Sequence, residues 1–430
     1  MSDPTRDAEG ILSTHAETAL LVVPRLQGES ERESQSALDE LESLVDTMGL
    51  ETARGIIAPL RKPASRYYFG SGKAQEVAEL ADELDVDCII FDEDLSPSQQ
   101  RNWEALTKRC VIDRHEVILD IFAARASTRE AVLQVGLARM EYSLPRLTRA
   151  WTHLSRQRGG SRGTRGEGET QLEVDRRIVL RKISRMKQEL NQVRKNRGVM
   201  RKQREAVPLP TAAIVGYTNA GKSSLLHNLT GAEVLIEDKL FATLDPTTRR
   251  IKLDGGNELL LTDTVGFIRK LPHDLVDAFK STLEETALSD FLLLVVDASD
   301  RELEEHLKVT KQVLNEIGAG EKPMLLCFNK TDLCTPEELH GLELRFPDAV
   351  FFSVRTGDGL DSLPGALERM LYGGLLRHSY RLPSSRHDLV ALAHRTGKVH
   401  REEYLEEGII LEATVPPKTD GLLRAYTEER

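Results

Sequence analysis

The sequence predicts an α/β protein of several domains, and three observations support this. Short apolar runs alternate with helical segments over residues 16–127, at the rhythm of a small parallel α/β domain. A glycine-rich segment at 216–223 stands between an apolar run and a helical pattern, as in domains that hold phosphate groups. Between these regions, residues 128–207 carry two long helical patterns around a glycine-rich loop, which indicates an antiparallel hairpin.

In the first domain, expected strands and helices follow one another in regular alternation. Residues 1–15 are polar and are typical of a disordered tail. We expect strands at 19–23, 52–58, 87–91 and 110–113, and helices at 31–48, 73–84, 96–108 and 116–124. Ser96 before Pro97 is a helix start, because serine caps a helix and proline fits its first turn. The segment Gly70-Ser71-Gly72-Lys73 lacks the spacing of a phosphate loop, so a tight turn into a helix is preferred over an anion site.

The predicted hairpin concentrates positive charge. We expect one helix over 129–158, interrupted only by Pro145, and a second over 171–204. Residues 145–205 carry 18 Lys and Arg against 6 Asp and Glu, so the rest of the chain carries −23 of a total net charge of −11. Such a basic segment is an electrostatic footprint for an RNA backbone, although a solvated helix face is the alternative. The candidate RNA contacts are Arg158, Arg162, Arg165, Arg176 and Arg177.

The glycine-rich segment Gly216–Ser223 reads G-Y-T-N-A-G-K-S and has the spacing of a phosphate loop. Its glycines let the backbone curl so that N–H groups face phosphates, and the helix that follows adds its partial positive charge. Lys222 is expected to reach the β- and γ-phosphates, and Ser223 to offer its hydroxyl to Mg²⁺. The predicted nucleotide contacts here are Gly216, Tyr217, Thr218, Asn219, Ala220, Gly221, Lys222, Ser223 and Ser224.

Two further segments complete the phosphate side of the site. Asp263-Thr264-Val265-Gly266 follows a strand-like run at 258–261; the acid can hold Mg²⁺ through water, and the Gly266 N–H can sense the γ-phosphate. A loop threonine is also expected to close on Mg²⁺ when a γ-phosphate is present. Thr243, Thr247 and Thr248 are all chemically able to do so.

The segment Asn329-Lys330-Thr331-Asp332 follows an apolar run at 324–328 and selects the base. The Asp332 carboxylate can accept two hydrogen bonds from guanine, whereas adenine has no matching pair of donors, so the predicted ligand is GTP. Asn329 is expected to brace the loop, and the stem of Lys330 to pack over the ring. A strand at 349–352 leads to Ser353, Val354 and Arg355, whose backbone is placed to touch the guanine carbonyl.

Together these motifs resemble the translation-factor-like GTPases, and within them the Obg–HflX group. The segments 69–76 (F-G-S-G-K-A-Q-E), 91–100, 113–122 and 163–177 resemble HflX in particular. By that resemblance Thr243 is the metal-binding threonine, and Phe241, Ala242, Thr243, Leu244 and Asp245 form the switch segment. The resemblance implies a cytoplasmic GTPase that binds the large ribosomal subunit and splits or rescues stalled ribosomes under stress. It also implies that the hairpin loop points towards the peptidyl-transferase region.

One expected catalytic group is missing. Many GTPases orient the attacking water with a glutamine directly after D-x-x-G, and here that residue is Phe267. A phenyl ring offers no such hydrogen bond, so we expect slow hydrolysis by the free protein and stimulation by a partner. Asn219 suggests one alternative, a potassium ion near the phosphates, because related potassium-binding GTPases carry asparagine at this place. The other interpretation is that Asn219 braces the loop.

Composition sets the remaining bounds. No apolar run approaches the roughly 18 to 20 residues of a membrane span, and the first ten residues do not form a signal peptide. The four cysteines lack metal-type spacing, which favours buried thiols and a reducing cytoplasm. In the last domain we expect a helix at 386–394 and strands at 399–405 and 409–415, with His394 and His400 too dispersed for a metal site.

The sequence thus predicts a P-loop GTPase domain that follows a small parallel α/β domain and a long antiparallel helical hairpin, and that precedes a small α+β domain. The expected bounds are 1–15 for the tail, 16–127, 128–207, 208–372 and 373–430. Lys222, Thr243 and Gly266 are the expected catalytic residues, with Mg²⁺ as cofactor and the free chain a monomer. The alternative is an RNA-binding scaffold or ribosome-assembly module that holds GTP and rarely hydrolyses it.

Overall fold

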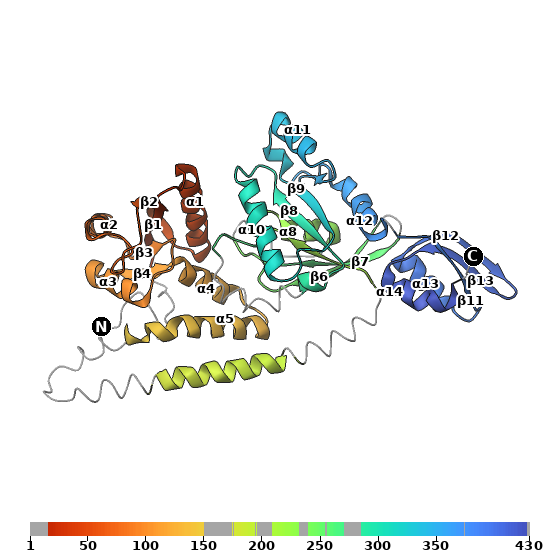
Figure 1. Cartoon of the computed structure of the whole chain (residues 1–430), viewed down its shortest axis with the longest axis horizontal. Coiled ribbons are helices and arrows are strands. Elements are labelled where there is room, and N and C mark those ends of the chain that lie inside the picture. Colours follow the sequence, from red (N-terminus) through yellow and green to blue (C-terminus); the bar gives the residue numbers. More distant parts are fainter. Residues whose placement is uncertain are drawn as a thin grey trace. The chain divides into compact units, whose positions relative to one another are not determined.

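The computed structural model describes residues 16–149, 174, 176–193, 195, 209–231, 240–253, 256–270, 285–373 and 375–427. The described residues form two compact units, one up to Val193 and the other from 195 onward. The expected tail at 1–15 lies outside the described residues. The first unit contains one sheet, and the second contains two (Figure 1).

The first sheet is entirely parallel and has the strand order β2-β1-β3-β4. Its strands are β1 (Thr18–Leu26), β2 (Glu51–Leu60), β3 (Cys88–Phe91) and β4 (Cys110–Asp113). The helices between and after them are α1 (Glu31–Met48), α2 (Ser71–Glu83), α3 (Pro97–Thr107) and α4 (Arg114–Arg125). The predicted parallel α/β arrangement is therefore confirmed. Its core includes Phe69, Phe91 and Trp103, all fully buried.

Local capping signals account for several helix starts. The Ser30 hydroxyl accepts from the Glu33 amide at the start of α1, and Ser96 does the same with Gln99 at α3, where Pro97 occupies the first turn. Each of these caps satisfies an amide that has no partner within its helix. Gly70 precedes α2 without a side-chain cap, and Lys73 pairs with Glu76 on the same helix.

The first helix of the hairpin is shorter than expected. Helix α5 spans Arg129–Ser143, and Leu144–Arg149 then form a 3-10 turn instead of continuing it. Pro145 explains the change, because it has no amide to donate within the helix. The buried face of α5 contains Ala131, Gln134, Val135 and Ala138, whereas Val132 is half exposed.

The second helix of the hairpin packs along α5 (Figure 1). Residues 176–193 are helical, and a side-chain carbon added to Gly136 of α5 would lie 2.7 Å from Met186 Cε. Lys187 Nζ lies 2.7 Å from Glu141 Oε1, which ties the two helices at their surface. The predicted glycine-rich loop and the candidate RNA contacts Arg158, Arg162 and Arg165 lie outside the described residues.

Asp113 joins the end of α5 to the first sheet. Its Oδ1 accepts from the Glu116 amide, which it caps, and from the Tyr142 hydroxyl at 2.8 Å. Its Oδ2 accepts from the Leu95 amide and lies 3.4 Å from the Arg146 guanidinium. Burial, together with the neighbouring Glu116 carboxylate, raises the pKa of Asp113 to about 6 against these hydrogen bonds.

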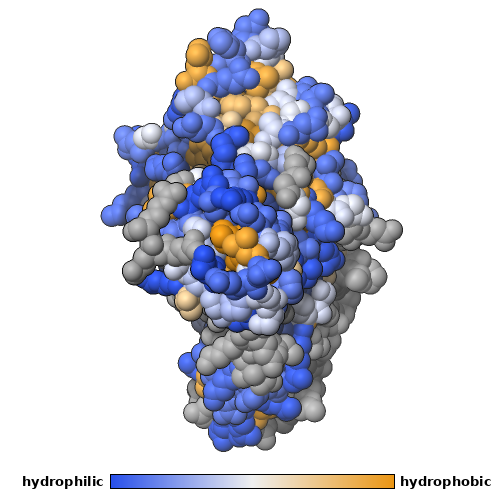
Figure 2. All heavy atoms as spheres, turned by 90° about the vertical axis from the view of Figure 1, so that its right-hand side faces the viewer, coloured by the Kyte–Doolittle hydropathy of each residue, from blue (hydrophilic) through white to orange (hydrophobic). Residues whose placement is uncertain are grey.

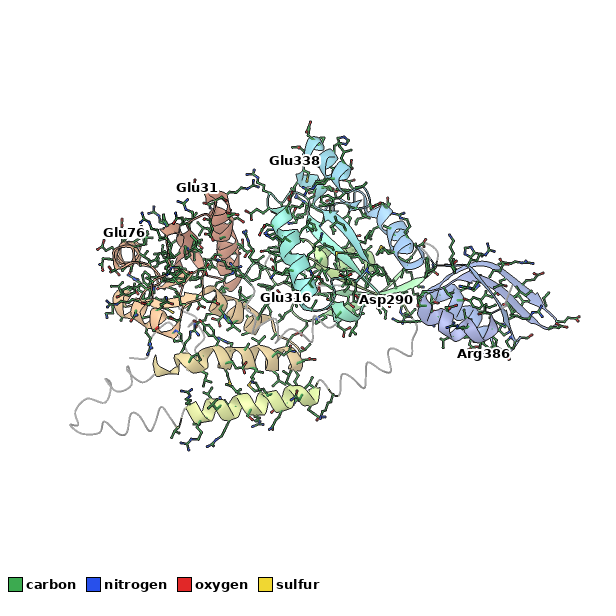
Figure 3. The ribbon with its side chains drawn as sticks, in the orientation of Figure 1. Glu31, Glu76, Asp290, Glu316, Glu338 and Arg386 are labelled. Carbon is green, nitrogen blue, oxygen red and sulfur yellow. The ribbon has the colours of Figure 1, made fainter. Side chains whose placement is uncertain are left out.

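The second unit is organised around a six-stranded sheet of order β10-β9-β8-β5-β7-β6, in which only β6 is antiparallel to its neighbour. Its strands are β5 (Thr211–Val215), β6 (Thr247–Lys252), β7 (Glu258–Asp263), β8 (Phe291–Asp297), β9 (Met324–Asn329) and β10 (Val350–Phe351). Its helices are α8 (Lys222–Thr230), α10 (Leu303–Glu316), α11 (Pro336–Arg345) and α12 (Leu363–Tyr372), with 3-10 turns at Thr331–Leu333 and Leu360–Ser362. Glu338, labelled in Figure 3, forms the capping box of α11 with Thr335.

The last residues form a three-stranded antiparallel sheet of order β11-β13-β12. Strands β12 (Lys398–Leu405) and β13 (Gly408–Thr414) and helix α13 (His387–Thr396) match the expected elements closely. Strand β11 (His378–Leu382), helix α14 (Pro417–Leu423) and the 3-10 turn Arg424–Tyr426 were not expected. Strand β11 is short and carries Tyr380 and Leu382 as its only buried apolar side chains, so its sequence pattern is weak.

The two sheets of the second unit are connected by hydrogen bonds to the C-terminal end of helix α13. Asn257, just before β7, donates its amide hydrogens to the carbonyl oxygens of Gly397 at 2.6 Å and His394 at 3.1 Å, in the amide orientation that satisfies both ends. The Tyr372 hydroxyl donates to the carbonyl oxygen of Thr396 at 3.0 Å. Asp290, labelled in Figure 3, lies 2.9 Å from Lys418 Nζ. The six-stranded part therefore supplies the C-terminal cap of α13.

In the part of the chain that the structure describes, no helix has both the length and the apolar character needed to cross a membrane. The face drawn in Figure 2 is mostly hydrophilic, with small separate hydrophobic patches. Cys88, Cys110 and Cys327 are buried free thiols, as expected, and Cys334 is partly exposed.

Candidate functional site

The phosphate loop connects β5 to α8 in the expected strand–loop–helix order. Gly216 has a φ of +149° and Gly221 a φ of +92°, which other residues rarely adopt. A side chain at Gly216 would collide with the carbonyl oxygen of Val295, and one at Gly221 with the amide of Asn329. Both glycines are therefore required by space as well as by backbone conformation.

Lys222 lies buried beneath this loop. Its Nζ donates to the carbonyl oxygens of Gly216 at 3.1 Å and Tyr217 at 2.7 Å. Burial lowers the pKa of this lysine to about 8, although the Asp263 carboxylate opposes the shift. An ammonium held by two carbonyls has a third hydrogen to offer, and an anion in the loop is a suitable acceptor.

Ser223, Thr243 and Asp263 meet at one point. The Ser223 hydroxyl lies 2.6 Å from Asp263 Oδ2 and 2.7 Å from the Thr243 hydroxyl, which lies 2.9 Å from the same carboxylate oxygen. Burial raises the pKa of Asp263, and the hydroxyls and Lys222 partly offset this. Asp263 Oδ1 is buried and has no hydrogen-bond partner among the described residues. The two hydroxyls and the Asp263 carboxylate, one oxygen of which has no partner in the described part of the chain, form a set of oxygen ligands that fits Mg²⁺.

The structure also separates the three candidate threonines. Thr243 alone contacts Ser223 and Asp263. Thr248 lies in β6 and forms a hydroxyl pair with Thr262 at 2.9 Å, and Thr247 begins the same strand. Around Thr243, Phe241 and Leu244 are buried and hold the segment against the domain, while Ala242 and Asp245 are partly buried in the same turn.

The D-x-x-G segment lies directly on the phosphate loop. The Thr218 amide donates to the carbonyl oxygen of Phe267 at 2.8 Å, and the Phe267 amide donates to that of Gly216 at 3.1 Å. A side chain on Gly266 would lie 2.8 Å from Thr218 Cα and 2.9 Å from Lys222 Nζ. Thr264 and Val265 are buried, and the Thr264 hydroxyl donates to the carbonyl oxygen of Ile214. The Gly266 backbone therefore faces the same space as the Lys222 ammonium.

Phe267 is 1% exposed and its ring belongs to the core. The position directly after D-x-x-G, where other GTPases hold a water-orienting glutamine, is therefore filled by a buried apolar ring.

The segments predicted to select the base are linked to the phosphate loop. The Asn329 side chain donates to the carbonyl oxygen of Ala220 at 2.9 Å and accepts from the Val354 amide at 3.0 Å. The Ser353 hydroxyl donates to Asp332 Oδ1 at 2.7 Å. Asn329 thus joins three loops, which fixes the position of the Asp332 segment relative to the phosphate loop. Thr331 and Arg355 flank this carboxylate, with the Arg355 guanidinium 4.0 Å from Asp332 Oδ2.

Some contacts of the site involve residues outside its motifs. Lys330 has a φ of +64°, and its Nζ lies 2.7 Å from Asp297 Oδ2 at the end of β8. In the sequence, Asp297 is indicated only by its position at the end of an apolar run. The Tyr217 ring stacks on His306 of α10, and the Tyr217 hydroxyl accepts from the Arg269 amide. No spacing rule connects these three residues, because they come from separate segments.

The remaining candidate residues lie in the phosphate loop, in α8 and in the hairpin. Asn219 has a φ of +58° at the tip of the loop, and Ser224 is partly buried in the first turn of α8. Arg176 and Arg177 are exposed on the second helix of the hairpin, in the first unit. Over the described ranges, no group of three or more His, Cys, Asp and Glu side chains is arranged to hold a metal.

Family models match three successive regions of the chain. Residues 35–123 match the family model of the N-terminal region of GTP-binding GTPases, and 125–204 match the model of their middle region. Residues 211–330 match the model of a 50S ribosome-binding GTPase. Among solved structures, the chain is similar to a GTP-binding protein of Sulfolobus solfataricus in complex with GDP, at 26% identity over 82% of this chain and 98% of that one, with a TM-score of 0.44.

Curated relatives cover nearly the whole chain. The GTPase HflX of Akkermansia muciniphila is 52% identical over 427 residues, which is 96% of this chain and 98% of that protein. The GTPase HflX of Escherichia coli K12 is 44% identical over 375 residues, 87% of this chain and 88% of that protein. With its phosphate loop, its D-x-x-G segment and its guanine-selecting motif in one α/β domain, the chain belongs to the HflX family of GTPases.

Proposed function

We propose that the chain binds the large ribosomal subunit in a GTP-dependent way, hydrolyses GTP there, and so splits or rescues stalled ribosomes under stress. The observation that carries this proposal is the meeting of Ser223, Thr243 and Asp263 around one carboxylate oxygen. It joins the phosphate loop, the switch segment and the D-x-x-G segment at a single point. A ligand at that point therefore controls the position of the Phe241–Asp245 loop.

Individual roles follow from the contacts. Lys222 is assigned to the β- and γ-phosphates, and the amides of Gly216–Ser224 to the phosphate oxygens. The Gly266 amide is assigned to the γ-phosphate, because Gly266 faces Lys222. Asp332 is assigned to guanine, with Asn329, Lys330, Thr331 and the segment Ser353–Arg355 around the base. In-line attack of water on the γ-phosphate then yields GDP, and Lys222 and the loop amides offset the charge that develops.

Ser223 and Thr243 would hold Mg²⁺ directly, and Asp263 would hold it through water. Bound there, the ion would supply positive charge that offsets the negative charge of the phosphates. The loop from Phe241 to Asp245 closes over the nucleotide when the Thr243 hydroxyl reaches this position. Hydrolysis of GTP to GDP releases Thr243, and the loop opens again.

Hydrolysis by the free protein is proposed to be slow, because Phe267 is buried and cannot orient water. A bound ribosome is the proposed source of the missing group. Potassium at Asn219 is the second candidate, because Asn219 is exposed in the phosphate loop. Equal turnover in sodium and potassium buffers would exclude it.

The ribosomal partner is supported by the description of the GTPase-domain family and by the basic hairpin helix. Residues 176–187 place Arg176, Arg177, Arg181, Lys182, Arg185 and Lys187 on exposed positions. We assign RNA contact to this helix and to the loop that holds Arg158, Arg162 and Arg165. Because we propose that the chain acts on ribosomes, we also propose that it is located in the cytoplasm and that it is a monomer when free. The division at 1–15, 16–127, 128–207, 208–372 and 373–430 is the proposed domain organisation.

Sedimentation with large ribosomal subunits tests this function. The purified chain is centrifuged with subunits in the presence of GDP, of a non-hydrolysable GTP analogue, or of no nucleotide. We expect co-sedimentation to be strongest with the GTP analogue, and the Thr243→Ala variant to lose the difference between nucleotides. Equal binding of the wild-type chain in all three conditions contradicts the proposal.

A second candidate function is a scaffold that holds GTP on RNA with little turnover, and the buried Phe267 favours it. Multiple-turnover hydrolysis with and without large subunits separates the two. Stimulation of tenfold or more, about 1.4 kcal/mol of barrier, supports the switch. A rate that stays unchanged when subunits are added supports the scaffold.

A further inference from the structure

Three hydrogen bonds fasten the residues just after the D-x-x-G segment, Phe267 and Arg269, to the phosphate loop. Two are backbone bonds between Phe267 and the residues on either side of Tyr217. The third is made by a side chain: the Tyr217 hydroxyl accepts from the Arg269 amide at 2.8 Å. The segment after Gly266 is therefore fixed at alternate residues, and Tyr217 makes the last of these attachments.

Tyr217 is itself held in place by α10. Its ring stacks on the His306 imidazole, with centroids 3.7 Å apart and planes 15° from parallel. The other side of His306 is fixed by a hydrogen bond from Nδ1 to the Asp300 carboxylate, whose Oδ1 accepts from the Glu302 amide. The direction of the Tyr217 hydroxyl is thus set by an element outside the phosphate loop.

Arg269 is held from its other end by the same element. Its guanidinium lies 2.6 Å from Glu302 Oε2, and the two side chains are 17% and 13% exposed. A partly buried ion pair of this kind is shielded from water better than a surface pair. Residue 269 therefore has its backbone tied to Tyr217 and its side chain tied to Glu302.

The position of Gly266 depends on these ties. Gly266 is three residues before Arg269, and a side chain added to it would lie 2.9 Å from Lys222 Nζ. A shift of the segment at residue 269 moves the Gly266 amide relative to the Lys222 ammonium. Interactions in the transition state are sensitive to displacements on the order of 1 Å.

We propose that Tyr217 is a positioning residue for GTP hydrolysis, which acts through the Arg269 amide to hold the Gly266 amide against the γ-phosphate. The inference rests on the proposed role of Gly266. The ring of Tyr217 and its hydroxyl have separate tasks: the ring anchors the loop on His306, and the hydroxyl fixes the D-x-x-G segment. The Tyr217→Phe change removes the second task alone.

The test measures hydrolysis and binding together in the full-length protein. Single-turnover GTP hydrolysis and the affinities for GDP and for a non-hydrolysable GTP analogue are measured for wild type, Tyr217→Phe and Glu302→Gln. Tyr404→Phe, on the exposed edge strand β12, is the matched control. Removal of one neutral hydrogen bond predicts a hydrolysis rate about fivefold lower in Tyr217→Phe, with GDP affinity within about twofold of wild type. Glu302→Gln is expected to lower the rate in the same direction, and Tyr404→Phe to leave it unchanged.

Two outcomes overturn the inference. One is an unchanged hydrolysis rate in Tyr217→Phe. The other is a decrease in GDP affinity as large as the decrease in rate, because that result assigns Tyr217 to the stability of the loop. Failure of the underlying function is recognised separately through Gly266→Ala. If that variant hydrolyses GTP at the wild-type rate, the role of Gly266 is wrong, whatever Tyr217 does.

Discussion

Phe267 shows how one side chain limits the chemistry of the site. Its amide and carbonyl bind the phosphate loop, while its ring fills the core at 1% exposure. The backbone of this residue therefore serves the nucleotide site, and its side chain serves packing. Substitutions at this position separate the two tasks.

Replacing Phe267 with glutamine is expected not to accelerate hydrolysis. The new amide would be directed into the core, where it lacks partners, and the change should lower the stability of the domain by about 3 kcal/mol. Hydrolysis rates and thermal unfolding in GDP measure the two effects. Phe267→Leu is the control, because it keeps an apolar side chain and should cost less. A faster rate in Phe267→Gln would show that position 267 reaches the attacking water.

Asp113 gives a second residue-scale prediction, on pH. Its folded pKa of about 6 lies above the value of 3.8 for a free aspartate, so the folded chain binds more protons in this interval. The contribution of Asp113 to stability is fully present below pH 3.8 and is lost as the pH rises through 6. Lowering the pH from 7 to 5 should therefore favour wild type over Asp113→Asn by about 1 kcal/mol.

The fluorescence of Trp103, which is fully buried in the core of the first unit, reports the unfolding of that unit. Because the chain has two tryptophans, the measurement uses a Trp151→Phe background. Urea unfolding of that background and of its Asp113→Asn derivative is compared at pH 7 and 5. A constant difference between the two proteins would mean that Asp113 titrates near its ordinary pKa.

At the scale of elements, the turn between β6 and β7 caps α13. Asn257 and Tyr372 donate to carbonyl oxygens at the end of that helix, which have no partner within it. Strand β6 begins four residues after Thr243, and β7 ends at Asp263. One end of this hairpin thus lies next to Thr243 and Asp263, and the other end contacts the C-terminal sheet domain.

Asn257→Ala should loosen this junction. Leaving buried helix carbonyls unsatisfied costs about 1 to 3 kcal/mol. We expect faster hydrogen exchange in α13, read by mass spectrometry, and a smaller increase in Tyr372→Phe, which removes one donor. Asn102→Ala, in the first unit, is the control. Unchanged exchange in α13 after Asn257→Ala would show that water replaces the cap.

At the scale of the whole molecule, charge is distributed very unevenly. The chain has a net charge of −11, yet residues 145–205 carry an excess of positive charge. Within the described part of that segment, exposed Arg181 and Arg185 face solvent on the second hairpin helix. An acidic protein with one basic element should contact a phosphate backbone in one orientation.

Neutralising Arg181 and Arg185 to glutamine is expected to weaken binding to large ribosomal subunits and to flatten its salt dependence. The slope of log affinity against log salt should fall by about 0.7 to 0.9 for each phosphate that the variant no longer neutralises. Lys308→Gln with Lys311→Gln, on exposed positions of α10, is the control of equal charge. Identical slopes for both double variants would place the RNA-binding surface elsewhere.

Much of this protein follows from local sequence alone. Helix α1 has the bounds expected from the sequence, and Gly216, Lys222, Asp263 and Asn329 lie in the strand–loop segments in which their motifs were expected. The same holds for the order of strands and helices in the first domain. These features are predictable because a cap, a glycine conformation or a motif depends on residues close together in the chain.

Tertiary structure alone decided the rest. It distinguished Thr243 from Thr247 and Thr248, buried Phe267 in the core, and added β11 and α14. It also brought Tyr217 to His306 and Asn257 to the end of α13. The physical reason is the same in the long-range cases: each depends on an interaction between segments far apart in sequence, whose residues carry no periodicity or motif in common.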